Sequence, residues 1–186
     1  MLDLELVAVD VQDVVADALL VPVDGALCRL GGAAAAALRA ALPDDERADE
    51  LAYVSEELER LRPLPDTEAR TIDGVARWRW LVVSAAYPHS KDGRVYTPAE
   101  CAGLLRAAIP RALGAAVATE ARSLALTVIG TAYRMPAPLA ISALADGLAS
   151  ARGVPLRVTW AFRDAELLQL AHAAANRLGL QGPVAG

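Results

Sequence analysis

The sequence has few of the residues that build disulfide frameworks and metal sites. Of its 186 residues, two are cysteine (Cys28 and Cys101) and two are histidine. Two distant cysteines without metal-ligand spacing exclude a disulfide framework and a zinc site, so we expect both to be small buried side chains in a reducing cytoplasm. A catalytic thiol paired with a histidine is the alternative. We expect no metal and no cofactor.

Long apolar runs without a charge or a proline are also missing. No stretch of about 18 such residues occurs, and residues 1–5 show no basic region that leads into an apolar one. We therefore expect no membrane span, no signal peptide and a cytoplasmic location. The length fits one domain, which we place at residues 1–180, followed by a flexible tail at 181–186.

The sequence has no excess of positive charge. The formal net charge is −5, and residues 44–62, with eight acids and three arginines, account for all of it. The neutral remainder offers no basic face for long nucleic acid. Apolar residues at helical spacing within the acidic segment predict a surface helix, inserted at 44–63.

What the chain does have is a regular alternation of strand and helix patterns. Asp73-Gly74 predicts a turn within an antiparallel pair, Thr97-Pro98-Ala99-Glu100 a capped helix start, and Pro110 a kink or break near Ile109. The expected strands are 4–11, 18–23, 68–75, 78–86, 124–129 and 156–162; the expected helices are 32–42, 44–61, 98–120, 138–151 and 164–178. This order predicts a three-layer α/β/α sandwich around a mixed, mostly parallel sheet of six or seven strands.

Two of the strand–helix junctions contain glycine. Strand 18–23 precedes Gly31-Gly32 and an alanine-rich helix, and strand 124–129 precedes the loop 130–136 and another helix. A helix N-terminus offers free backbone N–H groups and a positive dipole end, which favour a phosphate. Two such loops facing each other would hold a diphosphate, although each alone is also typical of a tight turn.

Four places in the chain resemble the macro domain, an ADP-ribose-binding family, and the resemblance covers nearly the whole sequence. They are residues 9–12 with 17–20, residues 21–24 with Gly31-Gly32, residues 67–69 with 81–88, and residues 129–136. A weaker resemblance is to the macro-like N-terminal domain of leucyl aminopeptidases, in which the fold serves assembly.

The macro-domain resemblance implies a nucleotide site. Asp10, followed by Val11, matches the acid that accepts a hydrogen bond from the adenine amino group, and Phe162 matches an aromatic residue that stacks on adenine. The alternatives are a turn aspartate and a core phenylalanine. The residues implied around the diphosphate and distal ribose are Gly31, Gly32, Ala33, Gly130, Thr131, Ala132, Tyr133 and Arg134.

The sequence also departs from the family's pattern. Asp24 stands where the family has a ribose-facing asparagine, and a carboxylate cannot donate the amide hydrogen bonds of asparagine. Alanines at 33 and 132 replace glycines of the two loops, and Ser84 stands where hydrolytic relatives often carry histidine. These departures disfavour conventional ADP-ribose hydrolysis.

We therefore expect a protein that binds ADP-ribose or a related nucleotide diphosphate as its small-molecule partner. One alternative is a degenerate domain with an assembly role, acting as a homo-oligomer without ligand turnover. Trp78 and Trp80, which the alternation of a strand places on one face, would favour it if exposed. A second alternative is a hydrolase of an ADP-ribose derivative in which Asp24 is the general base.

Overall fold

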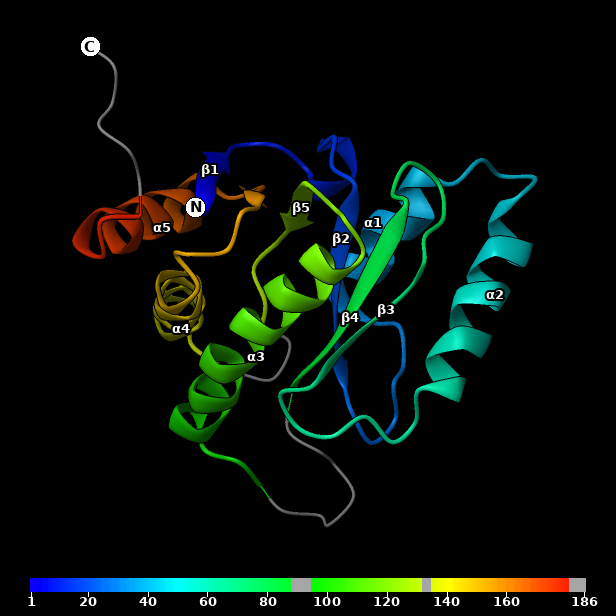
Figure 1. The fold of residues 1–186 in the computed structure, drawn as a ribbon, viewed down its shortest axis with the longest axis horizontal. Coiled ribbons are helices and arrows are strands. Elements are labelled where there is room, and N and C mark those ends of the chain that lie inside the picture. The colour runs from blue at the N-terminus through cyan, green and yellow to red at the C-terminus, as the bar shows by residue number, and fades with distance from the viewer. Residues whose placement is uncertain (88–94, 132–134, 181–186) are drawn as a thin grey trace.

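Six strands form one sheet in the computed structural model, which describes residues 1–87, 95–131 and 135–180 (Figure 1). The strands are β1 (Asp3–Val7), β2 (Ala18–Asp24), β3 (Ala69–Asp73), β4 (Trp80–Tyr87), β5 (Ser123–Leu126) and β6 (Arg157–Ala161). They lie in the order β1-β6-β5-β2-β4-β3, with β3 antiparallel to β4 and the other neighbours parallel. The expected mixed, mostly parallel sheet is confirmed.

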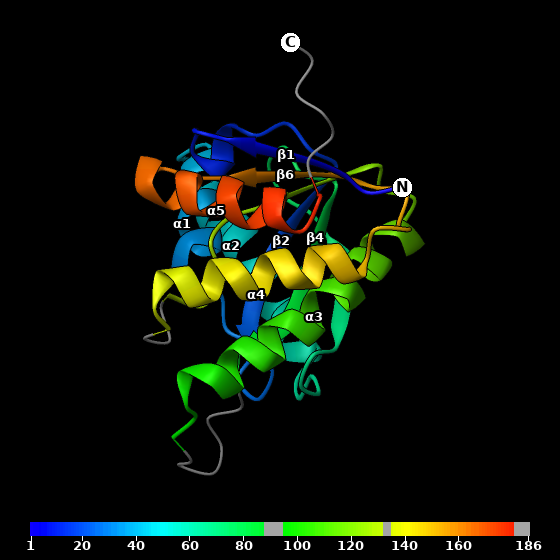
Figure 2. The ribbon, with the colours of Figure 1, turned by 90° about the vertical axis from the view of Figure 1, so that its left-hand side faces the viewer.

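Helices cover both faces of this sheet. They are α1 (Gly32–Ala41), α2 (Arg47–Arg60), α3 (Pro98–Ala118), α4 (Ala137–Ser150) and α5 (Ala165–Arg177), and a short 3-10 turn, η1, spans Val11–Asp13. Figures 1 and 2 show α3, α4 and α5 on one face and α1 and α2 on the other. Successive residues of β2, such as Leu19 and Leu20, are buried in the two separate clusters, which explains why the central strands are apolar on both faces.

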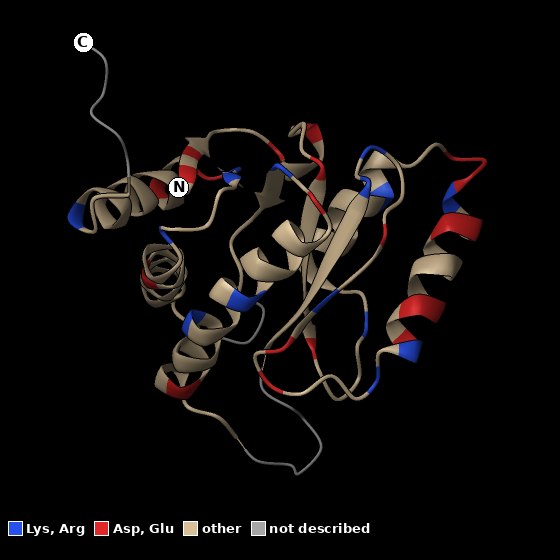
Figure 3. Ribbon diagram, in the orientation of Figure 1, with Lys and Arg blue, Asp and Glu red and all other residues tan. Residues whose placement is uncertain are grey.

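The acidic segment forms α2, at the outer side of the molecule. Val54 and Leu58 are buried toward the sheet, while acidic residues follow the outside of the helix (Figure 3). The helix expected in this segment is therefore present. The predicted tail at 181–186 lies outside the described residues.

Helix α3 begins as expected and runs as one helix to Ala118, close to the expected end at residue 120. The Thr97 hydroxyl accepts a hydrogen bond from the Glu100 N–H, and the Glu100 carboxylate accepts one from the Thr97 N–H at 2.8 Å. Of the expected kink or break near Ile109, the break is wrong, because the helix runs through Pro110 to Ala118, and the kink stays a prediction. Packing compensates for the hydrogen bond that proline cannot donate: this stretch is buried between the sheet and α4.

Helix α3 is also long and apolar enough, by length and composition, to cross a membrane. Its apolar residues Leu105, Ile109 and Leu113 are buried against the rest of the domain. Core packing therefore accounts for its composition.

The contact between α3 and α4 requires a glycine. A Cβ atom added at Gly147 would lie 2.8 Å from Ile109 Cβ and 3.0 Å from the Arg106 carbonyl oxygen. Gly147→Ala is expected to lower the free energy of unfolding by about 1–3 kcal/mol through overpacking, measured by urea denaturation. Gly114→Ala on α3 is the control, because its Cβ meets nothing within 4 Å; equal stability of the two variants would contradict this packing.

The prediction that Trp78 and Trp80 share a strand face is wrong. Trp80 begins β4 and packs half-buried on the α3 side, whereas Trp78 precedes the strand and is 2% exposed in the cluster of α1 and α2. The turn before β4 breaks the alternation, with Ala76 at φ 56° and the Gly74 N–H donating to the Arg79 carbonyl at 2.9 Å. Trp78 therefore does not supply the exposed surface that would favour the assembly alternative.

Candidate functional site

The candidate site lies at the carboxyl ends of the parallel strands β2, β5 and β6. This edge of an open α/β sheet is where such folds bind ligands. Two cavities open here, and the N-terminus of α1 borders both. We call them the base-side cavity and the loop cavity.

The base-side cavity has a volume of about 80 Å³ and contains the expected residues Asp10, Val11 and Ala33. It is completed by the end of β6 and by Thr127, which follows β5. The lining residues are Val9, Asp10, Val11, Gln12, Ala33, Ala36, Ala37, Thr127, Ala161 and Arg163. The structure therefore brings together residues from both ends of the chain.

Asp10 is held by an arginine that the sequence analysis missed. Arg163 donates to both carboxylate oxygens of Asp10, with 3.0 Å between Nη2 and Oδ2, and the Gln12 amide donates to Oδ2 at 3.1 Å. The hydrogen bond from Arg163 keeps the pKa of Asp10 below its usual value, and the same contact raises the pKa of Arg163. In this structure Asp10 therefore forms an ion pair with Arg163, at the position directly before η1.

The Asp10–Arg163 pair gives a direct test by titration. Arg163→Ala is expected to raise the pKa of Asp10 toward its ordinary value. An NMR titration of the Asp10 carboxyl group measures this pKa. Because folding lowers this pKa, the pair contributes to stability above the ordinary aspartate pKa, and the contribution is lost as the pH falls through the lowered value. An unchanged Asp10 pKa in the variant would show that the pair does not form in solution.

The loop cavity, of about 200 Å³, contains three further expected residues: Asp24, Gly31 and Gly32. It is also lined by Pro22, Val23, Leu27, Arg29, Leu30 and Tyr87. Gly31 precedes α1, no side chain caps that helix, and Gly32 has φ 64°, a conformation that favours glycine. The first amides of α1 are therefore open to an acceptor from a ligand.

Asp24 ends β2 and is 6% exposed. Its Oδ1 accepts a hydrogen bond from the Ala26 N–H at 2.8 Å, and its carbonyl accepts from the N–H groups of Leu27 and Cys28. The carboxylate thus holds the start of the loop that lines the cavity. Asp24 therefore has a structural role whether or not it contacts a ligand.

Phe162 lines neither cavity, although its neighbours Ala161 and Arg163 line the base-side cavity. It is 2% exposed and packs against Trp160, with 5.0 Å between the ring centroids, on the side of the sheet covered by α4 and α5. In this structure Phe162 is therefore a residue of the hydrophobic core. Stacking of Phe162 on adenine stays a prediction that requires this ring to become accessible.

The second predicted loop is described in part. Gly130 has φ 105°, and an added Cβ would lie 3.0 Å from Met135 Cε, so glycine is required at this position. Gly130 and Thr131 line neither cavity. Ala132, Tyr133 and Arg134 lie outside the described residues, and their contacts with a ligand stay predictions.

The two thiols do not favour the catalytic-thiol alternative. Burial raises the pKa of both Cys28 and Cys101, which disfavours the reactive thiolate. Across residues 1–87, 95–131 and 135–180, no group of three His, Cys, Asp or Glu side chains is placed to hold a metal ion.

The fold is a three-layer α/β/α sandwich with two cavities at the strand ends. Comparison with solved structures gives the particular fold: the chain has the macrodomain fold. The Oceanobacillus iheyensis macrodomain with ADP superposes with a TM-score of 0.73 and 18% identity, covering 95% of this chain and 92% of that one. A mutant of the same macrodomain with ADPR gives a TM-score of 0.71 and 17% identity, with 96% and 94% covered.

A macrodomain from Trypanosoma brucei in complex with ADP gives a TM-score of 0.65 and 17% identity, covering 94% of this chain and 67% of that one. No protein-family model matches the sequence, and no curated protein matches it either. At these identities the comparison establishes the fold, and the resemblance inferred from the four sequence segments is confirmed at that level.

Proposed function

We propose that this protein binds ADP-ribose or a related nucleotide diphosphate across the base-side and loop cavities. The observation that carries the proposal is the uncapped, glycine-started N-terminus of α1, which lies between the two cavities. A diphosphate there would accept hydrogen bonds from the first amides of the helix. The base would lie beside Asp10 and the distal ribose beside Asp24. Structural neighbours with ADP and ADPR support a ligand of this class.

Isothermal titration with ADP-ribose tests the proposal, with AMP and NAD as comparison ligands. Asp10→Ala is expected to weaken ADP-ribose binding about tenfold, because the base loses a charged acceptor. Arg163→Ala is the matched variant: it removes the other half of the ion pair but frees Asp10 for the base, so binding is expected to hold or strengthen. Equal weakening by both variants would show that the pair matters only for structure.

Asp24→Asn distinguishes ligand binding from catalysis. Asparagine keeps the oxygen that accepts from Ala26, adds an N–H donor for a ribose hydroxyl and removes a negative charge near the diphosphate. We expect ADP-ribose to bind about two- to tenfold more tightly to this variant. Weaker binding would mean that the Asp24 carboxylate accepts from the ligand. Turnover of an ADP-ribose derivative that disappears in Asp24→Asn would support the hydrolase alternative instead.

A further inference from the structure

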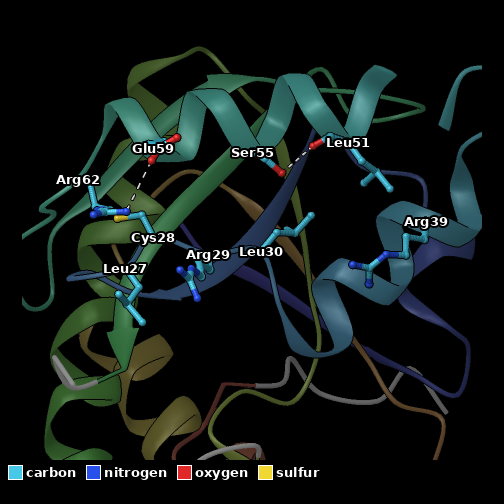
Figure 4. A pocket seen from close by; sticks show the side chains of 9 residues that line it. All are labelled: Leu27, Cys28, Arg29, Leu30, Arg39, Leu51, Ser55, Glu59 and Arg62. Atoms are coloured by element: carbon cyan, nitrogen blue, oxygen red, sulfur yellow. Dashed lines mark hydrogen bonds and ion pairs between the residues drawn. The ribbon is translucent and has the colours of Figure 1, made fainter. Parts of the chain in front are cut away.

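A third cavity lies between α1 and α2 and belongs to neither part of the nucleotide site. Its volume is about 340 Å³ (Figure 4). It is lined by Leu27, Cys28, Arg29, Leu30, Arg39, Leu51, Ser55, Glu59 and Arg62. Leu27, Arg29 and Leu30 also line the loop cavity, so one short segment separates the two spaces. We call this space the α1–α2 cavity.

Three guanidinium groups from three parts of the chain surround the α1–α2 cavity. Arg29 comes from the loop after β2, Arg39 from the last turn of α1, and Arg62 from the segment after α2 (Figure 4). The one carboxylate in the lining, Glu59, lies 3.7 Å from Arg62. The lining therefore carries an excess of two positive charges in a chain of net charge −5.

The acidic helix beside this cavity leaves that excess unbalanced. Several acids of the segment 44–62 form ion pairs with arginines of the same segment, such as Glu57 with Arg60 and Asp44 with Arg47. The side chains of Arg29 and Arg39 form no hydrogen bond or ion pair with the part of the chain that the structure describes. Two unpaired guanidinium groups thus line a concave space despite nearby carboxylates.

The chemistry of this lining suits a phosphoryl anion. Guanidinium groups form paired, charge-assisted hydrogen bonds with phosphate oxygens. Leu27, Leu30 and Leu51 and the buried Cys28 form the apolar part of the wall, and the cavity is open enough to solvent to admit a small anion. We propose that the α1–α2 cavity is an anion site for a small phosphoryl compound, separate from the nucleotide site and behind the loop that lines it.

Titration with inorganic pyrophosphate tests this site. Arg39→Gln is the key variant because Arg39 lines the α1–α2 cavity and does not line the loop cavity. This variant is expected to weaken pyrophosphate binding about tenfold. Arg177→Gln, an arginine on α5, removes the same charge far from the cavity and is expected to leave binding unchanged. Thermal unfolding of both variants checks that they fold equally well.

A second variant separates this inference from the proposed function. Gly31→Leu fills the loop cavity and leaves the α1–α2 lining intact, so it is expected to keep pyrophosphate binding. Loss of binding in Gly31→Leu alone would place the anion in the nucleotide site and overturn the inference while leaving the proposed function standing. No pyrophosphate binding by the wild-type protein at millimolar concentration, or equal weakening by Arg39→Gln and Arg177→Gln, would also overturn it.

Discussion

Replacing Trp160 by alanine is expected to lower the free energy of unfolding by about 3–5 kcal/mol. Trp160 lies on β6, is 0% exposed and packs against Phe162 in the cluster formed with α3, α4 and α5. Its removal would leave a large cavity in a close-packed core, on the strand that itself ends at the base-side cavity. Urea denaturation followed by circular dichroism measures the loss.

Trp160→Phe is the matched variant for this prediction. The Trp160 indole N–H is buried and has no hydrogen-bond partner among the residues that the structure describes. Phenylalanine keeps an aromatic ring and removes this unpaired donor, whose desolvation costs about 1–3 kcal/mol. We therefore expect a much smaller loss than for Trp160→Ala. A phenylalanine variant as unstable as the alanine variant would contradict this account of the core.

Gly31→Leu is expected to weaken ADP-ribose binding about tenfold to a hundredfold, because the side chain competes with the ligand for the loop cavity. Gly31 has φ −153°, which any residue adopts, and an added Cβ meets nothing within 4 Å. The fold should therefore tolerate leucine, so the variant tests the volume of the cavity and not backbone strain. Isothermal titration measures the change in affinity.

Gly103→Leu is the control for this variant. Gly103 lies on α3, lines neither the base-side nor the loop cavity, and also has open space around an added Cβ. ADP-ribose affinity that changes equally in the two variants would show that Gly31 does not border the bound ligand.

The sheet and its helices could be predicted because apolar periodicity reports burial directly. The predicted break at Pro110 and the predicted face of Trp78 are wrong because tertiary packing and a turn overrode the local sequence preference. Proline disfavours a helix interior, yet α3 continues through Pro110 because the sheet and α4 bury this stretch. Strand alternation places residues two apart on one face, but the chain at Trp78 has not yet entered β4.

The candidate site could be predicted in part for the same reason. Asp10, Asp24, Gly31 and Ala33 lie at or next to the ends of regular elements, so fold topology brings them to one edge of the sheet. The partner of Asp10 could not be predicted, because Arg163 lies 153 positions away and a charge pair of this kind leaves no local pattern. The orientation of Phe162 depends on which face of β6 packs under α4 and α5, and the sequence of the strand does not specify this.

The most direct test of the account is a crystal structure of the protein with ADP-ribose. The diphosphate is expected at the first amides of α1, between Gly31 and Ala33, with the adenine beside Asp10 in place of Arg163. The distal ribose is expected beside Asp24. ADP-ribose bound elsewhere, or both cavities empty at saturating ligand, would contradict the account.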